Sequence, residues 1–112
     1  MEQQYRLRKK GQFRYVYRKG KGGACREMAI GFVKGPKLLV GFAVSKKIGH
    51  AVTRNLVKRR LRAAFRAEIP MLKKGLYVVT AREAIAQADY ARLSASLRYL
   101  LAKQKLYKDP DQ

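Results

Sequence analysis

The chain has 112 residues, of which 27 are Lys or Arg and 7 are Asp or Glu, so its formal net charge is +20. This length suits one domain, residues 1–112, and a hydrophobic content of 47% excludes a disordered chain. Because so large a charge repels itself, it indicates a polyanionic partner, for which a nucleic acid is a better candidate than an anionic membrane surface. Cys25 is the single cysteine, which excludes an internal disulfide and favours a cytoplasmic location.

The first part of the chain contains a basic arm and a short helix. Residues 1–11 are polar and basic, and we expect an arm that orders on contact with a partner. Residues 12–19 have helical spacing, because Phe13, Val16 and Tyr17 fall at positions i, i+3 and i+4 on one face.

Three further segments are predicted to be the strands of the sheet, and a loop precedes the first of them. The glycines and lysines of residues 19–23 predict a loop. Residues 27–34 alternate between two faces, as a strand does. A Gly-Pro turn separates them from residues 37–45, which are apolar on both faces and therefore predict a central strand. Residues 75–82 have the pattern of another buried strand.

Two longer helices complete the predicted elements. The first begins at residue 50 or 51 and runs to residue 69, where Pro70 stops it. The second spans residues 89–103, with Asp89 as its N-cap and a stripe of leucines on one face. Residues 108–112 form a polar tail. The predicted fold class is α+β, a small mixed central sheet with helices packed on it in the order α-β-β-(β)-α-β-α.

The most informative segment is the basic helix region 45–66, which holds eight Lys and Arg residues, one His and no acid. Helical projection places Val57, Leu61 and Phe65 on an apolar side that can pack on the sheet. A contiguous basic arc lies beside it and consists of Arg54, Asn55, Lys58, Arg59, Arg62 and Arg66. A solvated face is the usual fate of a charge run, but cations gathered without an acid favour contact with nucleic acid. The amide of Asn55 adds a donor and an acceptor that a plain charged face does not need.

Two further groups are candidates for nucleic-acid contact. Lys46 and Lys47 leave the predicted central strand where the helix begins, so they and the helix amides can hold a phosphate. His50 lies in the same turn, although a lone exposed histidine is more often incidental. Phe13 and Tyr17 have two interpretations that the residues leave open, a core pair or a stacking surface for single-stranded bases among flanking cations.

A catalytic constellation is nearly absent from the sequence. One histidine and one cysteine cannot supply the usual metal motifs, and the seven acids are scattered along the chain. The glycines of residues 19–23 are not followed by the GK[ST] of a phosphate-binding loop. We therefore expect neither a catalytic residue nor a metal ligand in the protein.

The run SKKIGHAVTRNLVKRRLR resembles the protein subunit of bacterial ribonuclease P, whose pattern is two basic residues, Gly, an Ala-Val-like step, Arg-Asn, then Lys-Arg and Arg. The resemblance extends from RLRKKGQFRYVYRKG through LVGFAVSKK and YVVTAR to the terminal LY, nearly the whole chain. One position departs from the family's usual Arg-Asn-Arg, because the third residue here is Leu56, away from the basic arc. Arg60 is a candidate to compensate for it nearby.

The resemblance implies both a fold and a function. It implies a left-handed βαβ crossover carried by the helix of residues 50–69, whereas pattern reasoning alone favours the right-handed form found in about 98% of such units. It implies an endoribonuclease holoenzyme in which a catalytic RNA removes the 5′ leader from precursor tRNA. That RNA performs the hydrolysis with bound Mg²⁺, so the protein supplies no catalytic residue.

The resemblance also assigns site residues and partners. The residues expected to face the catalytic RNA are Arg54, Asn55, Lys58, Arg59, Arg62 and, by its place in the same arc, Arg66. The residues expected to contact the leader are Phe13, Tyr17, Lys46, His50 and Arg82. The expected partners are ribonuclease P RNA and precursor tRNA, with no membrane and no obligate protein partner. The alternatives are a structural RNA-binding protein such as a small ribosomal protein, a nuclease acting alone, and a membrane-surface binder.

Overall fold

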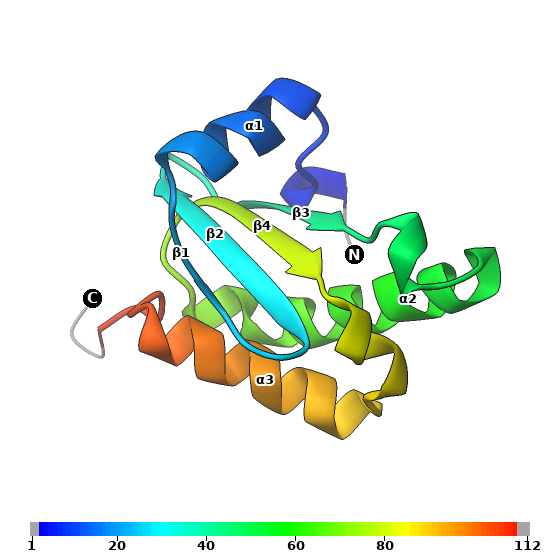
Figure 1. Ribbon diagram of the computed structural model, residues 1–112. Helices are drawn as coiled ribbons and strands as arrows, with labels where there is room; N and C mark the ends of the chain where they lie inside the picture. The colour runs from blue at the N-terminus through cyan, green and yellow to red at the C-terminus, as the bar shows by residue number, and fades with distance from the viewer. Residues whose placement is uncertain (1–2, 110–112) are drawn as a thin grey trace.

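Four strands form one sheet in the order β1-β2-β4-β3 in the computed structural model, which describes residues 3–109 (Figure 1). The strands are β1 (Lys21–Ala24), β2 (Met28–Lys34), β3 (Leu39–Ala43) and β4 (Gly75–Ala81). β2 is antiparallel to β1 and β4, and β3 is parallel to β4. The sheet is therefore mixed, and the predicted α+β class is confirmed.

Two predictions about the sheet were wrong. The predicted loop of residues 19–23 contributes most of β1, because backbone pairing with β2 needs no side chain and glycine is a poor indicator of a strand. The segment expected to be the central strand forms β3 at an edge, and β4 is central instead. β3 is apolar on both faces because each face is covered: Val40 is buried on one side and Leu39 packs beside Leu7 on the other.

Three α-helices pack on the sheet, and short 3₁₀ turns join the second and third of them to the strands. They are α1 (Lys10–Lys19), α2 (Ala51–Glu68) and α3 (Tyr90–Lys103). α2 begins and ends within one residue of its predicted bounds, and Pro70 lies in the 3₁₀ turn Ile69–Met71 that follows it. Asp89 is the N-cap of α3 as predicted, because its carboxylate accepts the Arg92 backbone N–H at 2.8 Å. No helix of residues 3–109 is both long and apolar enough to cross a membrane.

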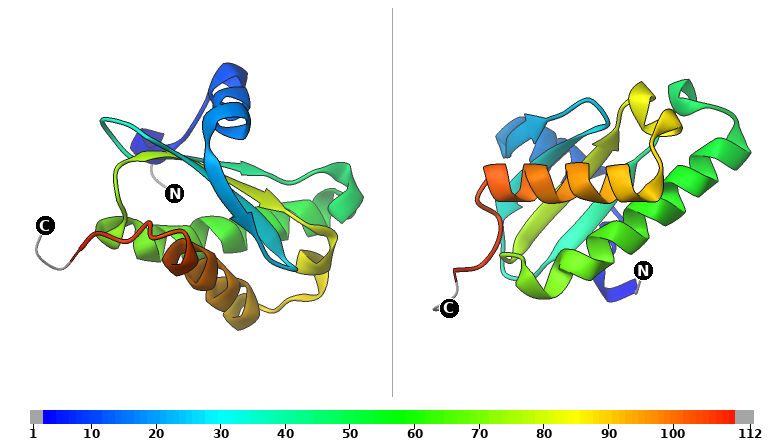
Figure 2. Two further views of the ribbon diagram at one scale, coloured as in Figure 1. Left: turned by 60° about the vertical axis from the view of Figure 1, so that its left-hand side comes forward. Right: turned by 90° about the horizontal axis from the view of Figure 1, so that it is seen from below.

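The sheet separates two unequal layers of helix. α2 and α3 lie side by side on one face, and α1 crosses the other (Figure 2). The larger core lies under α2 and α3, where the Tyr77 ring packs 5.4 Å from Phe65 and 4.8 Å from Phe32, centroid to centroid. Aromatic pairs at this spacing add roughly 0.5–1.5 kcal/mol each beyond their burial. Thus α2 is held on the sheet by its apolar side, as its pattern predicts.

The chain passes from β3 through α2 to the parallel strand β4 with a left-handed crossover. In the right-hand view of Figure 2, α2 and α3 lie toward the viewer, β3 and β4 run toward the upper right, and β4 is on the left of β3. This hand is the one implied by the family resemblance and the opposite of the general preference.

The N-terminal segment packs along the edge of the sheet. Arg6 forms a parallel bridge with Val40, and the Leu7 N–H donates to the Val40 carbonyl at 2.9 Å. The Leu7 side chain is buried with Val16 and Val78 beneath α1. At the other terminus, Lys108 N–H donates to the Met71 carbonyl at 2.8 Å, and residues 110–112 of the predicted tail lie outside the described residues.

A buried carboxylate joins the start of β2 to α3. Glu27 is 4% exposed, and its carboxylate accepts the Ser96 hydroxyl at 2.7 Å and the Arg92 Nε–H at 3.3 Å. The Ser96 hydrogen bond, helped by Arg92, lowers the pKa of Glu27 below its ordinary value although burial opposes this. Glu27, one of the seven acids, is thus buried in the fold, so it does not offset the positive charge of the surface.

Ser96→Ala tests this link between β2 and α3. Removing the hydroxyl leaves a buried acceptor short of a donor, and we expect a loss of about 1–3 kcal/mol in the free energy of unfolding at pH 7. A carboxyl with a lowered folded-state pKa stabilises the fold above its ordinary pKa of 4.5, and this contribution disappears as the pH falls through the folded-state pKa. The variant should therefore lose less stability than wild type between pH 7 and pH 3 in urea unfolding.

The matched control is Ser94→Ala on the same helix, where the hydroxyl accepts an exposed bond from Arg98. Its stability should follow the wild-type pH dependence. Equal pH profiles for the two serine variants would contradict a role for Ser96 in setting the pKa of Glu27.

Candidate nucleic-acid interface

The outer face of the sheet carries small residues that let α1 lie close to it. The Phe13 ring lies over Gly41 of β3, where any β-carbon would clash with it, and Val16 packs over Gly31 of β2. The Tyr17 hydroxyl is 3.1 Å from the Thr80 hydroxyl of β4. One face of α1 thus contacts three strands. It is the face that the spacing of Phe13, Val16 and Tyr17 predicted.

Phe13 and Tyr17 do not share the same environment. Val16 is fully buried, Phe13 is half-buried, and Tyr17 is 58% exposed although its hydroxyl contacts Thr80. Beyond Tyr17 the small side chains of Ala29 and Ala43 remain half-exposed, since no helix covers them. The two aromatic rings therefore border an open, small-residue surface of the sheet, which we call the outer surface (Phe13, Tyr17, Ala29, Ala43 and Thr80).

The loops at the carboxyl ends of β3 and β4 bring basic groups to one end of this surface. The 3₁₀ turns Lys46–Ile48 and Glu83–Gln87 contact each other. Lys46 and Lys47 are exposed, as is His50, which occupies the N-cap position of α2 without a side-chain capping bond. The imidazole of His50 therefore does not serve as a helix cap, which is the usual structural role of a side chain at this position.

Arg82 lies at the same end, two residues beyond Thr80. Its backbone N–H donates to the Glu27 carbonyl at 3.0 Å, and its guanidinium donates to the Cys25 carbonyl at 3.0 Å. The side chain stays exposed while being anchored at one nitrogen. The structure thus places Lys46, His50 and Arg82 at the carboxyl ends of β3 and β4, the end of the sheet where Thr80 contacts Tyr17.

The basic arc of α2 points away from the core. Asn55, Arg59 and Arg66 are exposed, and Arg54, Lys58 and Arg62 are half-buried along the border with the apolar side. At about 100° per residue the six side chains cover roughly 140° of the helix surface. Arg54 Nε is shielded from solvent and has no hydrogen-bond acceptor among residues 3–109, so this buried donor is left unsatisfied within the described fold.

Leu56 and Arg60 lie on the opposite flank of α2. Leu56 is half-buried outside the arc, as its projection predicts. The Arg60 guanidinium donates to the Ala88 carbonyl at 3.2 Å and so ties α2 to the segment before α3. Compensation of Leu56 by Arg60 stays a prediction, and this tertiary hydrogen bond already engages one nitrogen of the Arg60 side chain.

The two predicted sites meet at the edge of β3. An open hollow of about 230 Å³ lies between α1, β3 and α2, and its walls combine Phe13 with Lys58 and Arg62. Arg6 also lines it. Arg6 was not among the predicted site residues, although its alternation with the buried Leu7 in an extended segment is a signal that it points away from the core.

The acids of the described chain are mostly committed to the fold. Glu27 binds Ser96 and Arg92, Glu68 accepts the Tyr107 hydroxyl at 2.6 Å, and Asp89 caps α3. Burial and the neighbouring Glu68 carboxylate raise the pKa of Tyr107, which keeps that hydroxyl a donor. Among residues 3–109 no three His, Cys, Asp or Glu side chains are grouped so that they could hold a metal ion.

A small basic α+β domain with a left-handed crossover, an open outer surface and an adjoining basic arc has the features of an RNA-binding protein. The family model for ribonuclease P matches residues 1–105. The ribonuclease P protein component of Bacillus velezensis is 37% identical over 111 residues, which is 96% of each chain. The solved RNase P protein of Staphylococcus aureus superposes with a TM-score of 0.87 at 28% identity, over 93% of this chain and 98% of that one.

A second solved structure, the RNase P protein of Thermotoga maritima, has a TM-score of 0.78 at 28% identity, over 88% of this chain and 96% of that one. The chain belongs to the ribonuclease P protein family.

Proposed function

We propose that this chain is the protein subunit of a ribonuclease P holoenzyme, in which it binds the catalytic RNA and the 5′ leader of precursor tRNA. The observation that carries the proposal is the junction at Phe13, where an aromatic and small-residue surface meets the basic arc of α2. One surface suits unpaired bases and the other suits phosphates. Two RNA strands bound there would lie side by side on a single domain.

The basic arc is the proposed contact for ribonuclease P RNA. Its cations are spread over a little more than three turns of α2, and the helix is held on the sheet by the contact of Phe65 with Tyr77. Such an array can follow a phosphate backbone, displace its counterions and position the protein on the RNA. Asn55 adds an amide that can pair with a base edge or a 2′-hydroxyl.

The outer surface is the proposed contact for the leader. Tyr17 presents an exposed ring, and Phe13 presents the part of its ring that Gly41 does not cover. Stacking on such rings tolerates any base, at roughly 1–3 kcal/mol per base. Lys46, His50 and Arg82 lie at the end of this surface, where Lys46 and Arg82 would neutralise leader phosphates and reduce the repulsion between two polyanions.

We assign hydrolysis of the phosphodiester bond to the RNA with its bound Mg²⁺. The protein offers no fitting donor set for the ion within residues 3–109, and its buried acids are occupied by internal hydrogen bonds. On this proposal the protein raises affinity for the precursor and supplies no group to the reacting atoms. Its partners are the catalytic RNA and precursor tRNA, without an obligate protein partner.

A reconstitution assay tests the holoenzyme role. Adding the protein to a bacterial ribonuclease P RNA and a precursor tRNA should stimulate release of the 5′ leader most strongly at low Mg²⁺, where phosphate repulsion is least screened. Cleavage without the catalytic RNA would instead identify a nuclease acting alone. Tight RNA binding with no stimulation would favour a structural RNA-binding protein.

The double variant Phe13→Ala with Tyr17→Ala tests the outer surface. Loss of two stacking rings should weaken binding of precursor tRNA to the holoenzyme by about 10-fold or more, because each base contributes at least about 1 kcal/mol. Binding of mature tRNA, which lacks the leader, should change little. Equilibrium binding of both tRNAs measures the difference.

Tyr15→Ala is the matched control, since Tyr15 is an exposed aromatic on the far side of α1. It should leave both affinities unchanged. Equal losses for precursor and mature tRNA in the double variant would refute a leader contact at Phe13 and Tyr17.

Neighbouring arginines on α2 provide a test of the basic arc. Arg59→Gln should lower the slope of log affinity against log salt for ribonuclease P RNA by about 0.7–0.9, the value of one phosphate contact, with little change in stability. Arg60→Gln should leave that slope unchanged and reduce the free energy of unfolding by about 1 kcal/mol, because it loses the bond to Ala88. A lower salt slope for Arg60→Gln and an unchanged slope for Arg59→Gln would show that the arc does not contact the RNA.

A further inference from the structure

A second concentration of positive charge lies at the end of the sheet opposite His50 and Arg82. It occupies the amino ends of β3 and β4, where the β2–β3 turn, the segment before β4 and the C-terminal segment converge. We call it the lysine end, and it consists of Lys34, Lys37, Lys73, Lys74 and Lys108. Because β4 has seven residues at about 3.3 Å each, the lysine end lies roughly 20 Å from the carboxyl end of that strand.

Two adjoining hollows shape this end. One, of about 640 Å³, has Phe32, Gly35 and Pro36 between four of the lysines. The other, of about 470 Å³, continues past Pro36 and Lys74 to Tyr5 and Leu72. The Phe32 ring lies against Gly75, where no side chain separates it from the backbone. An apolar floor with a cationic rim is suited to a nucleotide, whose base is planar and whose phosphate is anionic.

The backbone that carries these lysines is tied together. Lys34 lies opposite Gly75 in the β2–β4 register. Lys73 N–H donates to the Leu106 carbonyl and Lys108 N–H to the Met71 carbonyl, both at 2.8 Å, on either side of a bridge between Leu72 and Tyr107. The positions of the cations are thus fixed by tertiary contacts, and binding an anion here orders only side chains.

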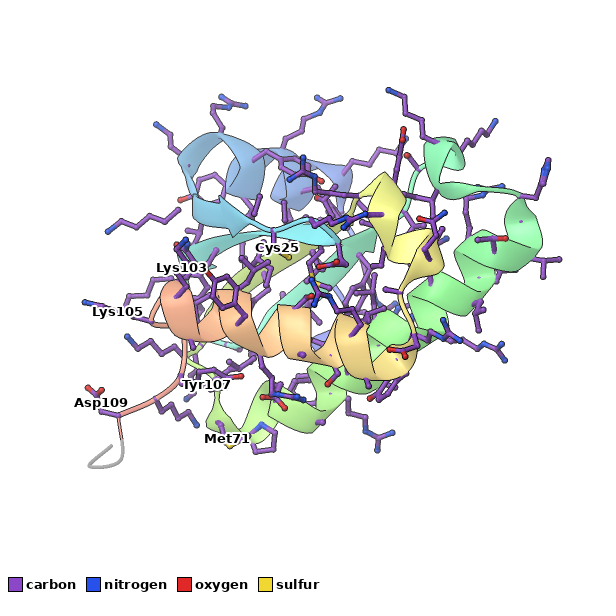
Figure 3. The ribbon with its side chains drawn as sticks, turned by 60° about the horizontal axis from the view of Figure 1, so that its bottom comes forward. Cys25, Met71, Lys103, Lys105, Tyr107 and Asp109 are labelled. Carbon is purple, nitrogen blue, oxygen red and sulfur yellow. The ribbon has the colours of Figure 1, made fainter. Side chains whose placement is uncertain are left out.

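No acid within residues 3–109 lines either hollow. Glu68, close by in the sequence, is buried and bonded to Tyr107. Asp109 follows Lys108, and Figure 3 shows it on the C-terminal segment at the margin of the molecule, beyond Tyr107. Five cations therefore line two adjoining hollows with little compensation, and their mutual repulsion would be relieved by a bound anion.

We propose that the lysine end is an additional RNA-binding surface, which takes an unpaired nucleotide and its flanking phosphates. The proposal rests on the proposed function, because the partner it names is an RNA. The strand bound there is separate from the leader at the outer surface, since about one strand length divides the two ends of the sheet. The same phosphodiester chemistry could come from ribonuclease P RNA or from precursor tRNA.

The test is the double variant Lys34→Gln with Lys74→Gln, which removes two exposed charges and keeps side-chain length. For wild type and variant, the affinity for ribonuclease P RNA alone is measured across a salt series, and then the affinity of each holoenzyme for precursor tRNA. Two lost phosphate contacts should lower the salt slope by about 1.4–1.8 in one of these titrations. A change in the first identifies the catalytic RNA as occupant, and a change only in the second identifies precursor tRNA.

The matched control is Arg98→Gln with Lys103→Gln, which removes two exposed charges from α3. Its salt slopes should equal those of wild type. If the lysine variant matches this control in both titrations while the wild-type protein still stimulates cleavage, the lysine end is only a solvated surface and the proposed function stands. If the wild-type protein does not bind either RNA, both the inference and the proposed function fail.

Discussion

The packing of α2 on the sheet through Phe65 and Tyr77 is the interaction on which the rest of the molecule depends. Tyr77 lies in the central strand, fully buried, with its hydroxyl bonded to the Lys73 carbonyl at 2.6 Å. Phe65 meets it edge to face, so the rotation of α2 about its own axis is fixed. The direction of every side chain in the basic arc follows from that rotation. The orientation of the basic arc is consequently set by the core beneath it.

The acidic and basic side chains of the molecule lie in different places. Glu27 and Glu68 are buried with internal hydrogen-bond partners, and the exposed Asp89 caps α3, so three of the acids described stabilise the fold. The cations are left in groups on α2, around the outer surface and at the lysine end. A net charge of +20 is therefore concentrated in particular places, and an RNA partner can be met by several of them at once.

The sequence predicted local features well and tertiary ones poorly. The bounds of α2, the cap at Asp89 and the arc on α2 depend on spacing along one helix, which periodicity reveals. The strand at residues 21–24 and the bond from Arg60 to Ala88 depend on partners distant in the sequence, so no local pattern signals them. The crossover hand came only from the family resemblance, since general preference indicates the opposite. Roles of site residues toward RNA remain predictions for the experiments above.

The edges of the sheet have a consequence for the protein before it meets its partner. β1 is only four residues long and is built from Lys, two Gly and Ala, and β3 has its free edge covered at Val40 by the N-terminal segment. Exposed strand edges invite another chain to pair with them, and short, lysine-bearing or covered edges resist it. Short length, lysine and the covering segment thus make it harder for a second copy of this chain to add a strand at either edge, which protects the free protein from aggregation.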